Sequence, residues 1–194
     1  MIQNHFINKK IQFEIDLIKK DFTLINKSDL KNFHILVKKS ILAIQKKKKI
    51  IFFGNGGSAA HAQHLATEII VKYKKKRVAL PALSITTDTS AITAIGNDFR
   101  FDQIFSRQIE AIGNSGDVAV GITTSGNSAN IINALRSANK KNITTFCFVG
   151  NKKSKAIKNC NYPILTMGNS VSSIQILQIF LGQIYCEFLE NYFK

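Results

Sequence analysis

Three ionisable side chains share one face of a segment that follows a glycine-rich turn. His61, His64 and Glu68 lie three and four residues apart, so a helix would direct them to the same side. An imidazole and a carboxylate four residues apart can share a proton or bind one metal ion. The spacing predicts acid–base or metal chemistry, although the polar face of an ordinary crossover helix would carry the same pattern.

The turn before this helix has the composition of a ligand-binding loop. The apolar run at residues 50–53 is typical of a buried parallel strand, and GNGGS follows it at residues 54–58. Glycines let the backbone approach a ligand, and a helix that begins with Ser58 as N-cap offers N–H groups to anions. We expect an anion or polyol site within residues 49–71. The turn matches neither the dinucleotide fingerprint nor the Walker pattern, so no nucleotide cofactor is expected.

A second polar turn, TTSGNS at residues 123–128, predicts a phosphate site. The hydroxyl groups of Thr123, Thr124 and Ser125 can donate to phosphate oxygens. Gly126 permits close approach, and Ser128 stands where a helix begins. A Ser/Thr-rich turn with a simple N-cap would explain one such loop, but two loops of this kind in one small domain indicate phosphate binding.

Strand and helix patterns alternate along the chain at the spacing of βαβ units. Strands are expected at residues 50–53, 78–85 (broken by Pro81), 117–122, 143–149 and 162–167, with a helix at 101–112 and a long final helix at about 170–192. This alternation predicts an α/β fold with a doubly wound parallel five-stranded sheet. Ligands of such sheets lie beyond the carboxyl ends of the strands, so the loops at 54–58, 86–90 and 123–128 should meet there.

Two amphipathic helices are expected before the first strand, at residues 3–25 and 28–46. Their apolar side chains recur at the helical period: Phe6, Ile11, Ile15, Ile18 and Phe22, then Leu30, Phe33, Val37, Ile41 and Ile44. They offer more apolar surface than one sheet face needs, which predicts a subunit interface. We expect one domain over residues 1–194, with helices at 1–46 and the α/β core at 47–194.

Composition limits the class of protein. The formal charge is +15, but lysines are spread along the whole chain, so direct nucleic-acid binding is not expected as the main function. No apolar run approaches the roughly 18 residues that cross a membrane, and the first ten residues lack the core of a signal peptide. Three cysteines without C-x-x-C spacing favour reduced thiols, so a cytoplasmic location is expected.

Several motifs together point to one family. GNGGSAA, TTDTS, AIGND, FSRQIEA, TTSGNSAN and a final helix with IQ and CE resemble the sugar isomerase (SIS) domain, from about residue 20 to the C-terminus. Within it they resemble the phosphoheptose isomerases of the GmhA type. That family interconverts sedoheptulose 7-phosphate and D-glycero-D-manno-heptose 7-phosphate for bacterial lipopolysaccharide or capsule. The resemblance implies a flavodoxin-like three-layer fold and a homotetramer with sites shared between subunits.

The resemblance also implies roles for individual residues. Glu68 matches the catalytic base, and His64, Glu68 and Gln175 match ligands of a zinc ion. The positions that match substrate contacts are Asn55, Gly56, Gly57, Ser58, Asn97, Asp98, Thr123, Thr124, Ser125, Ser128 and Gln175.

One position departs from the family where the chemistry is concentrated. The family has a histidine eight residues after Gln175, which serves as zinc ligand and catalytic acid–base, and this chain has Gln183 there. An amide does not titrate near neutral pH and binds zinc less well than imidazole, so Gln183 is a weaker member of both the metal and the catalytic set. The further departures are His61 for Asp, Lys72 for Arg, Ser173 for Arg, Ile176 for Glu and Gln178 for His.

Three functions are compatible with these residues. The first is an isomerase with a changed metal site, favoured by His64 and Glu68. The second is a non-catalytic protein of the DiaA type, which binds the replication initiator DnaA and also lacks the terminal histidine. Gln183 and Ser173 favour this second function. The third is a phosphosugar sensor without catalysis, which the loop at 123–128 would support.

Overall fold

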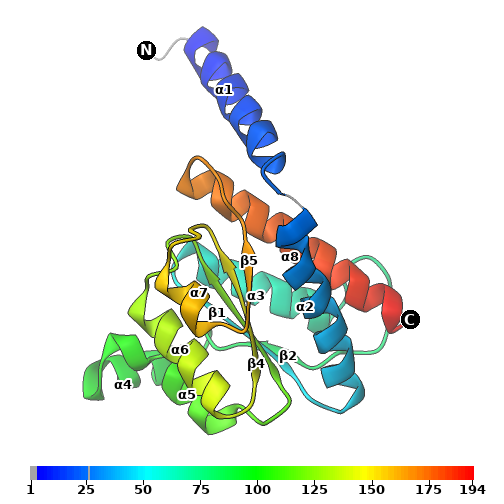
Figure 1. The fold of residues 1–194 in the computed structure, drawn as a ribbon, viewed down its shortest axis with the longest axis vertical. Coiled ribbons are helices and arrows are strands. Elements are labelled where there is room, and N and C mark those ends of the chain that lie inside the picture. The colour runs from blue at the N-terminus through cyan, green and yellow to red at the C-terminus, as the bar shows by residue number, and fades with distance from the viewer. Residues whose placement is uncertain (1–3, 26) are drawn as a thin grey trace.

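The computed structural model describes residues 4–25 and 27–194 (Figure 1). The elements in chain order are α1 (Asn4–Phe22), α2 (Lys27–Gln45), β1 (Ile50–Gly54), α3 (Gly57–Ile70), β2 (Ala82–Ser84), α4 (Thr89–Asp98), the 3₁₀ turn η1 (Phe101–Gln103), α5 (Ser106–Ile112), β3 (Val118–Thr123), α6 (Ala129–Lys140), β4 (Thr144–Val149), α7 (Lys155–Asn159), β5 (Tyr162–Leu165) and α8 (Val171–Tyr192). No helix in these two ranges has the length and apolar character needed to span a membrane.

The five strands form one parallel sheet in the order β2-β1-β3-β4-β5. Strands β1 and β3 lie side by side at its centre and are buried throughout, which explains their unbroken apolar sequences. The chain moves outward in opposite directions from this central pair. The predicted doubly wound α/β fold is confirmed, and its switch point lies between β1 and β3.

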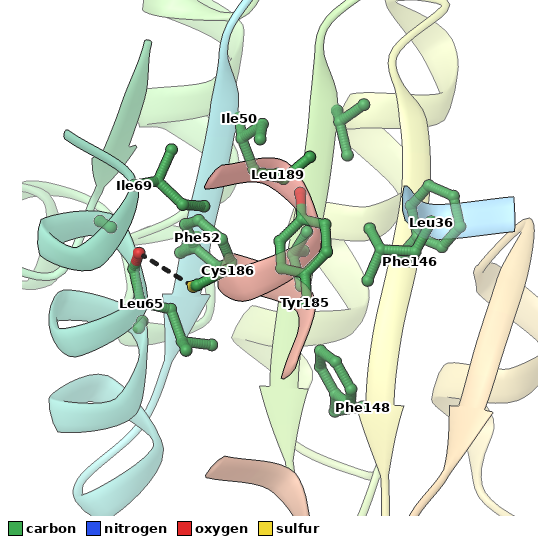
Figure 2. Packing of buried hydrophobic residues seen from close by; sticks show 14 of the residues in the cluster. Leu36, Ile50, Phe52, Leu65, Ile69, Phe146, Phe148, Tyr185, Cys186 and Leu189 are labelled. Atoms are coloured by element: carbon green, nitrogen blue, oxygen red, sulfur yellow. Dashed lines mark hydrogen bonds between the residues drawn. The ribbon is translucent and has the colours of Figure 1, made fainter. Parts of the chain in front are cut away.

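Alternate residues of the strands face two different helical layers. Ile50 and Phe52 point toward α2, α3 and α8, whereas Ile51 and Phe53 point toward α5, α6 and α7. Figure 2 shows the first of these two cores, in which Tyr185 of α8 lies over the sheet beside Phe52 and Phe146. The Tyr185 hydroxyl donates to Ser40 Oγ at 2.6 Å, so its polar atom is satisfied inside the core.

Helices α3 and α8 pack against each other, which matters for the site. A side chain at Gly182 would place its Cβ 2.7 Å from Leu65 Cδ1, so this position requires a glycine for close packing. One turn further on, Cys186 Sγ lies 3.8 Å from the carbonyl oxygen of Leu65 (Figure 2). The carboxylate of Glu190, which is buried, accepts hydrogen bonds from three consecutive backbone N–H groups, at residues 73–75. These contacts fix the relative position of the two helices.

Three local predictions were wrong in detail. The strand expected at 78–85 forms only at Ala82–Ser84, because Pro81 has no N–H to donate to a sheet. The helix expected at 101–112 is divided into η1 and α5. Ser58 is not the N-cap of α3, since that place belongs to Gly56, whose φ of +54° suits glycine.

The predicted N-terminal helices are present, but α1 packs only in part on the rest of the chain. It projects from the body, with its C-terminal end near α8 (Figure 1). Phe22 packs edge-on against Phe180 of α8, with ring centroids 4.9 Å apart. The first three turns leave Phe6, Ile11 and Phe13 exposed. The chain therefore carries an apolar helix surface that its own core does not cover.

Candidate active site

A small polar pocket lies at the switch point of the sheet. Its volume is about 70 Å³, and the residues that line it are Asn55, Ser58, Ile122, Thr123, Thr124, Ser125 and Ser128. Complete ligand pockets commonly measure at least about 300 Å³, so this one suits a single small group such as a phosphate. The loops after β1 and β3 meet here as predicted. The loop after β2 does not line this pocket, because Thr87 and Asp88 line a separate cleft with α4 and α5.

The loop after β3 is shaped by its own hydroxyl groups. Thr123 Oγ1 accepts a hydrogen bond from the N–H of Gly126 at 3.1 Å, and Ser125 Oγ accepts one from the N–H of Asn127 at 3.2 Å. Gly126 has a φ of +67°, and a Cβ there would lie 2.2 Å from Ser154 Oγ, so both strain and space require glycine. The tight turn thereby places several hydroxyl-bearing residues around the pocket.

The N-terminus of α6 opens onto the same pocket. Ser128 occupies the N-cap position, yet its side chain makes no capping hydrogen bond. Its hydroxyl and the N–H groups of Ala129 and Asn130 are therefore available to an anion, whereas the N–H of Ile131 donates to Asn130 Oδ1 at 2.9 Å. The pocket lining has neither acidic nor basic side chains, so its polar groups are hydroxyl, amide and backbone groups.

A reciprocal amide pair connects the two loops. Asn55 Nδ2 donates to Asn130 Oδ1 at 2.9 Å, and Asn130 Nδ2 donates to Asn55 Oδ1 at 2.8 Å. Asn130 is buried and was not among the predicted site residues, although it is the last letter of the TTSGNSAN motif. Its part is to hold the loop after β1 against the start of α6.

The predicted acid–base and metal residues meet along the contact between α3 and α8. His64 Nε2 lies 3.4 Å from Glu68 Oε1 on α3. Gln183 of α8 reaches the same imidazole, with its Nε2 atom 3.5 Å from His64 Nε2. Gln175 lies eight residues before Gln183 on α8 and packs against Gly57. A Cβ added at Gly57 would lie 2.7 Å from Gln175 Nε2. His64, Glu68 and Gln183 therefore lie together, whereas Gln175 lies at the glycine turn.

His61 belongs to the same face of α3 but differs in environment. Its Nδ1 atom is buried and has no hydrogen-bond partner among the residues that the structure describes. Burial lowers the pKa of His61, and the neighbouring imidazole of His64 lowers it further. His61 therefore lies on the same face as His64, with one buried ring nitrogen that has no hydrogen-bond partner among the described residues.

Two residues of α8 that depart from the family motifs have structural contacts instead of a place in the pocket. Gln178 is buried and donates to the carbonyl of Thr123 at 3.0 Å and to Thr166 Oγ1 at 3.2 Å, so it supports the end of β3. Ser173 forms a capping box with Ser170 at the start of α8. Both positions depart from the family, and both have structural roles here.

The structure does not bring Asn97 and Asp98 to the pocket within one chain. Both are exposed at the end of α4, where Asn97 Nδ2 donates to Asp98 Oδ1 at 2.8 Å. Neither residue lines the pocket at the switch point.

Comparison with known proteins gives a consistent result. The sequence profile of the SIS domain family matches residues 17–150. A phosphoheptose isomerase of Sulfurimonas denitrificans is 44% identical over 179 residues, which cover 90% of this chain and 92% of the relative. The phosphoheptose isomerase of Aquifex aeolicus is 46% identical over 149 residues, 77% of this chain and 78% of the relative.

Two solved structures extend the likeness to the fold. Phosphoheptose isomerase GmhA from Neisseria gonorrhoeae superposes with a TM-score of 0.87 at 31% identity, covering 95% of this chain and 99% of the other. A phosphoheptose isomerase from Francisella tularensis gives a TM-score of 0.86 at 25% identity, covering 98% and 100%. The agreement includes the N-terminal region as well as the α/β core.

Proposed function

The chain belongs to the phosphoheptose isomerase family of SIS-domain proteins, and we propose that it interconverts sedoheptulose 7-phosphate and D-glycero-D-manno-heptose 7-phosphate. Such a reaction would serve the synthesis of surface heptoses in lipopolysaccharide or capsule. The observation that carries the proposal is a phosphate-sized hydroxyl pocket next to a helix with a carboxylate and an imidazole. The named relatives favour catalysis over the DiaA-type and sensor alternatives.

The pocket at the switch point would bind the phosphate. Hydroxyl groups of Thr123, Thr124, Ser125 and Ser128 and the N-terminus of α6 would donate to its oxygens. Asn55 and the backbone of Gly56–Ser58 would hold the sugar hydroxyls nearer to α3. The carbon chain of the sugar would then extend from the pocket toward Glu68.

The isomerisation needs a group that moves one proton between neighbouring carbons. Glu68 would remove a proton from C1 of the ketose, giving an enediol, and return it to C2 to form the aldose. Meanwhile the hydroxyl at C1 loses its proton and the oxygen at C2 gains one. His64 contacts Glu68 and would help to move the proton between the oxygens, in a role that the family gives to the residue at position 183.

The residues at the α3–α8 contact fit a divalent cation, but with a mixed set of donors. His64 and Glu68 are good zinc ligands, whereas Gln175 and Gln183 would contribute amide oxygens, which bind zinc less well. Among the described residues no three His, Cys, Asp or Glu side chains come together to hold a metal. We therefore propose that zinc binds here with reduced affinity. When bound, it would polarise the sugar carbonyl.

The oligomer is part of the proposal. The exposed apolar side chains of α1, together with exposed Phe180 and Phe188 on α8, offer a surface for other copies of the chain. A tetramer would also bring Asn97 and Asp98 of one subunit to the pocket of another. Replacing Phe6 and Ile11 by lysine should reduce the molecular mass measured by light scattering. An unchanged mass would refute this part of the proposal.

The reaction itself can be tested directly. Sedoheptulose 7-phosphate is incubated with the protein in D₂O, with and without added zinc, and followed by NMR. Formation of the aldose, or entry of deuterium at C1 or C2, would support the isomerase. Binding of the sugar phosphate without exchange would refute it and favour a non-catalytic scaffold. We assign the reaction to the cytoplasm, since the cysteines are free and Cys147 and Cys186 are buried.

A further inference from the structure

We propose that Lys152, Lys153 and Lys155 form a cationic rim that supplies the positive charge for the phosphate group. The rim, defined by these three lysines, lies beside the loop at residues 123–128. The proposal deepens the proposed function and rests on it for the phosphate site and for the identity of the sugar, but not for the catalytic step. The rim would determine selectivity for doubly charged phosphate esters and the rate of their capture.

The backbone that carries the rim is attached to the phosphate loop at three points. The N–H of Gly150 donates to the carbonyl of Thr124 at 3.1 Å. The N–H of Lys155 donates to Asn127 Oδ1 at 3.1 Å, and the N–H of Ala156 donates to the carbonyl of Gly126 at 2.9 Å. These bonds hold the lysine-bearing segment next to the loop.

A buried serine packs the lysine-bearing segment against the loop at residues 123–128. Ser154 stands between the lysines, is only 2% exposed and packs directly on Gly126. The lysines on either side of it are exposed, and none forms an ion pair within residues 4–25 and 27–194. The segment is therefore anchored at its centre, and its three charged side chains are exposed to solvent.

The distribution of charge along the sequence favours this role. Residues 118–186 contain seven Lys and Arg residues and no Asp or Glu. This stretch includes the loops that follow β3, β4 and β5, so the carboxyl edge of that half of the sheet has no carboxylate of its own. A carboxylate from another segment, that of Asp21, contacts this edge and accepts hydrogen bonds from the backbone N–H and the side chain of Asn169.

The pocket needs such a charge from outside. A phosphate monoester carries about −1.5 to −2 charges at neutral pH, and the pocket lining has no basic side chain to balance them. Charges that do not touch the ligand still attract it across a Debye length of about 8–10 Å at moderate salt. The rim would therefore act mainly on binding and on KM, and only slightly on kcat.

A general excess of lysine is the competing explanation, and the chain offers a matched control. Lys46, Lys47 and Lys48 form a similar cluster immediately before β1, at the amino end of the strands. That end of the sheet is opposite to the pocket. Neutralising these three lysines changes the net charge by the same amount, but at the edge of the sheet that lies opposite to the pocket.

The test compares two triple variants with the wild-type chain. One is Lys152→Gln/Lys153→Gln/Lys155→Gln, and the control is Lys46→Gln/Lys47→Gln/Lys48→Gln. Binding of sedoheptulose 7-phosphate is measured by calorimetry and binding of inorganic phosphate by phosphorus NMR, at about 20 mM and about 300 mM salt. A third variant with arginine at the three rim positions keeps the charge.

The rim variant should raise the Kd of both ligands roughly three- to tenfold at low salt, with a smaller difference at high salt. The control and the arginine variant should stay within about twofold of the wild type. Equal Kd values for the rim variant and the control would overturn the proposal. If the wild type binds phosphate but does not turn over the sugar, the proposed reaction fails and the rim stands. If it binds neither ligand, both fail.

Discussion

Restoring an imidazole at position 183 should increase the activity of this protein. Gln183 Nε2 already lies 3.5 Å from His64 Nε2, so a histidine at this position would reach the same part of the site. The change Gln183→His would supply a titratable group and a stronger zinc ligand at once. Position 183 is partly exposed on α8, so the stability of the fold should change by less than about 0.5 kcal/mol.

The size of the effect follows from the chemistry that the glutamine lacks. A positioned general acid–base contributes about 10²- to 10⁴-fold to the rate. In the proposed mechanism, His64 would already supply part of this function in the wild type. We therefore expect the lower limit, an increase in kcat of about 100-fold, which corresponds to about 2.7 kcal/mol of activation free energy.

The assay is the conversion of sedoheptulose 7-phosphate at saturating substrate, with zinc added or removed by a chelator. Gln183→Leu serves as the control, because it keeps a similar size without a titratable group or ligand atom. The histidine variant should also retain activity at lower free zinc. A change in kcat of less than about threefold would show that another group already performs the proton transfer, and our account of Gln183 would be refuted.

Three further changes test other parts of the site and the fold. Glu68→Gln should abolish turnover while the Kd for the sugar phosphate stays within about threefold, and residual exchange in D₂O would exclude Glu68 as the base. Ser125→Ala with Ser128→Ala should weaken phosphosugar binding by about 2 kcal/mol in calorimetry, and an unchanged Kd would remove the phosphate from this loop. Burial by itself raises the pKa of Glu190, but hydrogen bonds from the backbone N–H groups of residues 73–75 lower it more, so that the net pKa is below its usual value. Its charged form stabilises the fold at neutral pH, and this contribution is lost as the pH falls through the folded-state pKa. Glu190→Gln should therefore melt at a lower temperature at pH 7 and lose less stability on acidification than the wild type, whereas parallel acid profiles would contradict this role.

The order of the elements was predictable because it depends on local patterns. Short apolar runs at the five strands alternate with helical periods, and this alternation permits few arrangements other than a parallel sheet. The two glycine and hydroxyl turns were predictable for the same reason, since parallel strands place all their carboxyl ends at one edge. Errors occurred where one residue decides a boundary, as at Pro81 and at Gly56.

The contacts between distant segments were not predictable from the chain's own patterns. The amide pair of Asn55 and Asn130 joins residues 75 positions apart, and no periodicity indicates it. The attachment of the lysine-bearing segment to the loop at 123–128 is of the same kind. Each of these two contacts depends on how whole helices and loops pack against the sheet.

The sequence by itself determined the fold class, the hydroxyl-rich loop at residues 123–128 and the helix that carries His64 and Glu68, because spacing and turn chemistry are local properties. Only the tertiary structure decided that Gln183, 119 positions from His64, lies within 3.5 Å of its imidazole. That meeting depends on the close packing of α3 on α8, where Gly182 admits Leu65. The tertiary structure also decided that Asn97 and Asp98 stay apart from the pocket of their own chain, since α4 ends at an exposed surface.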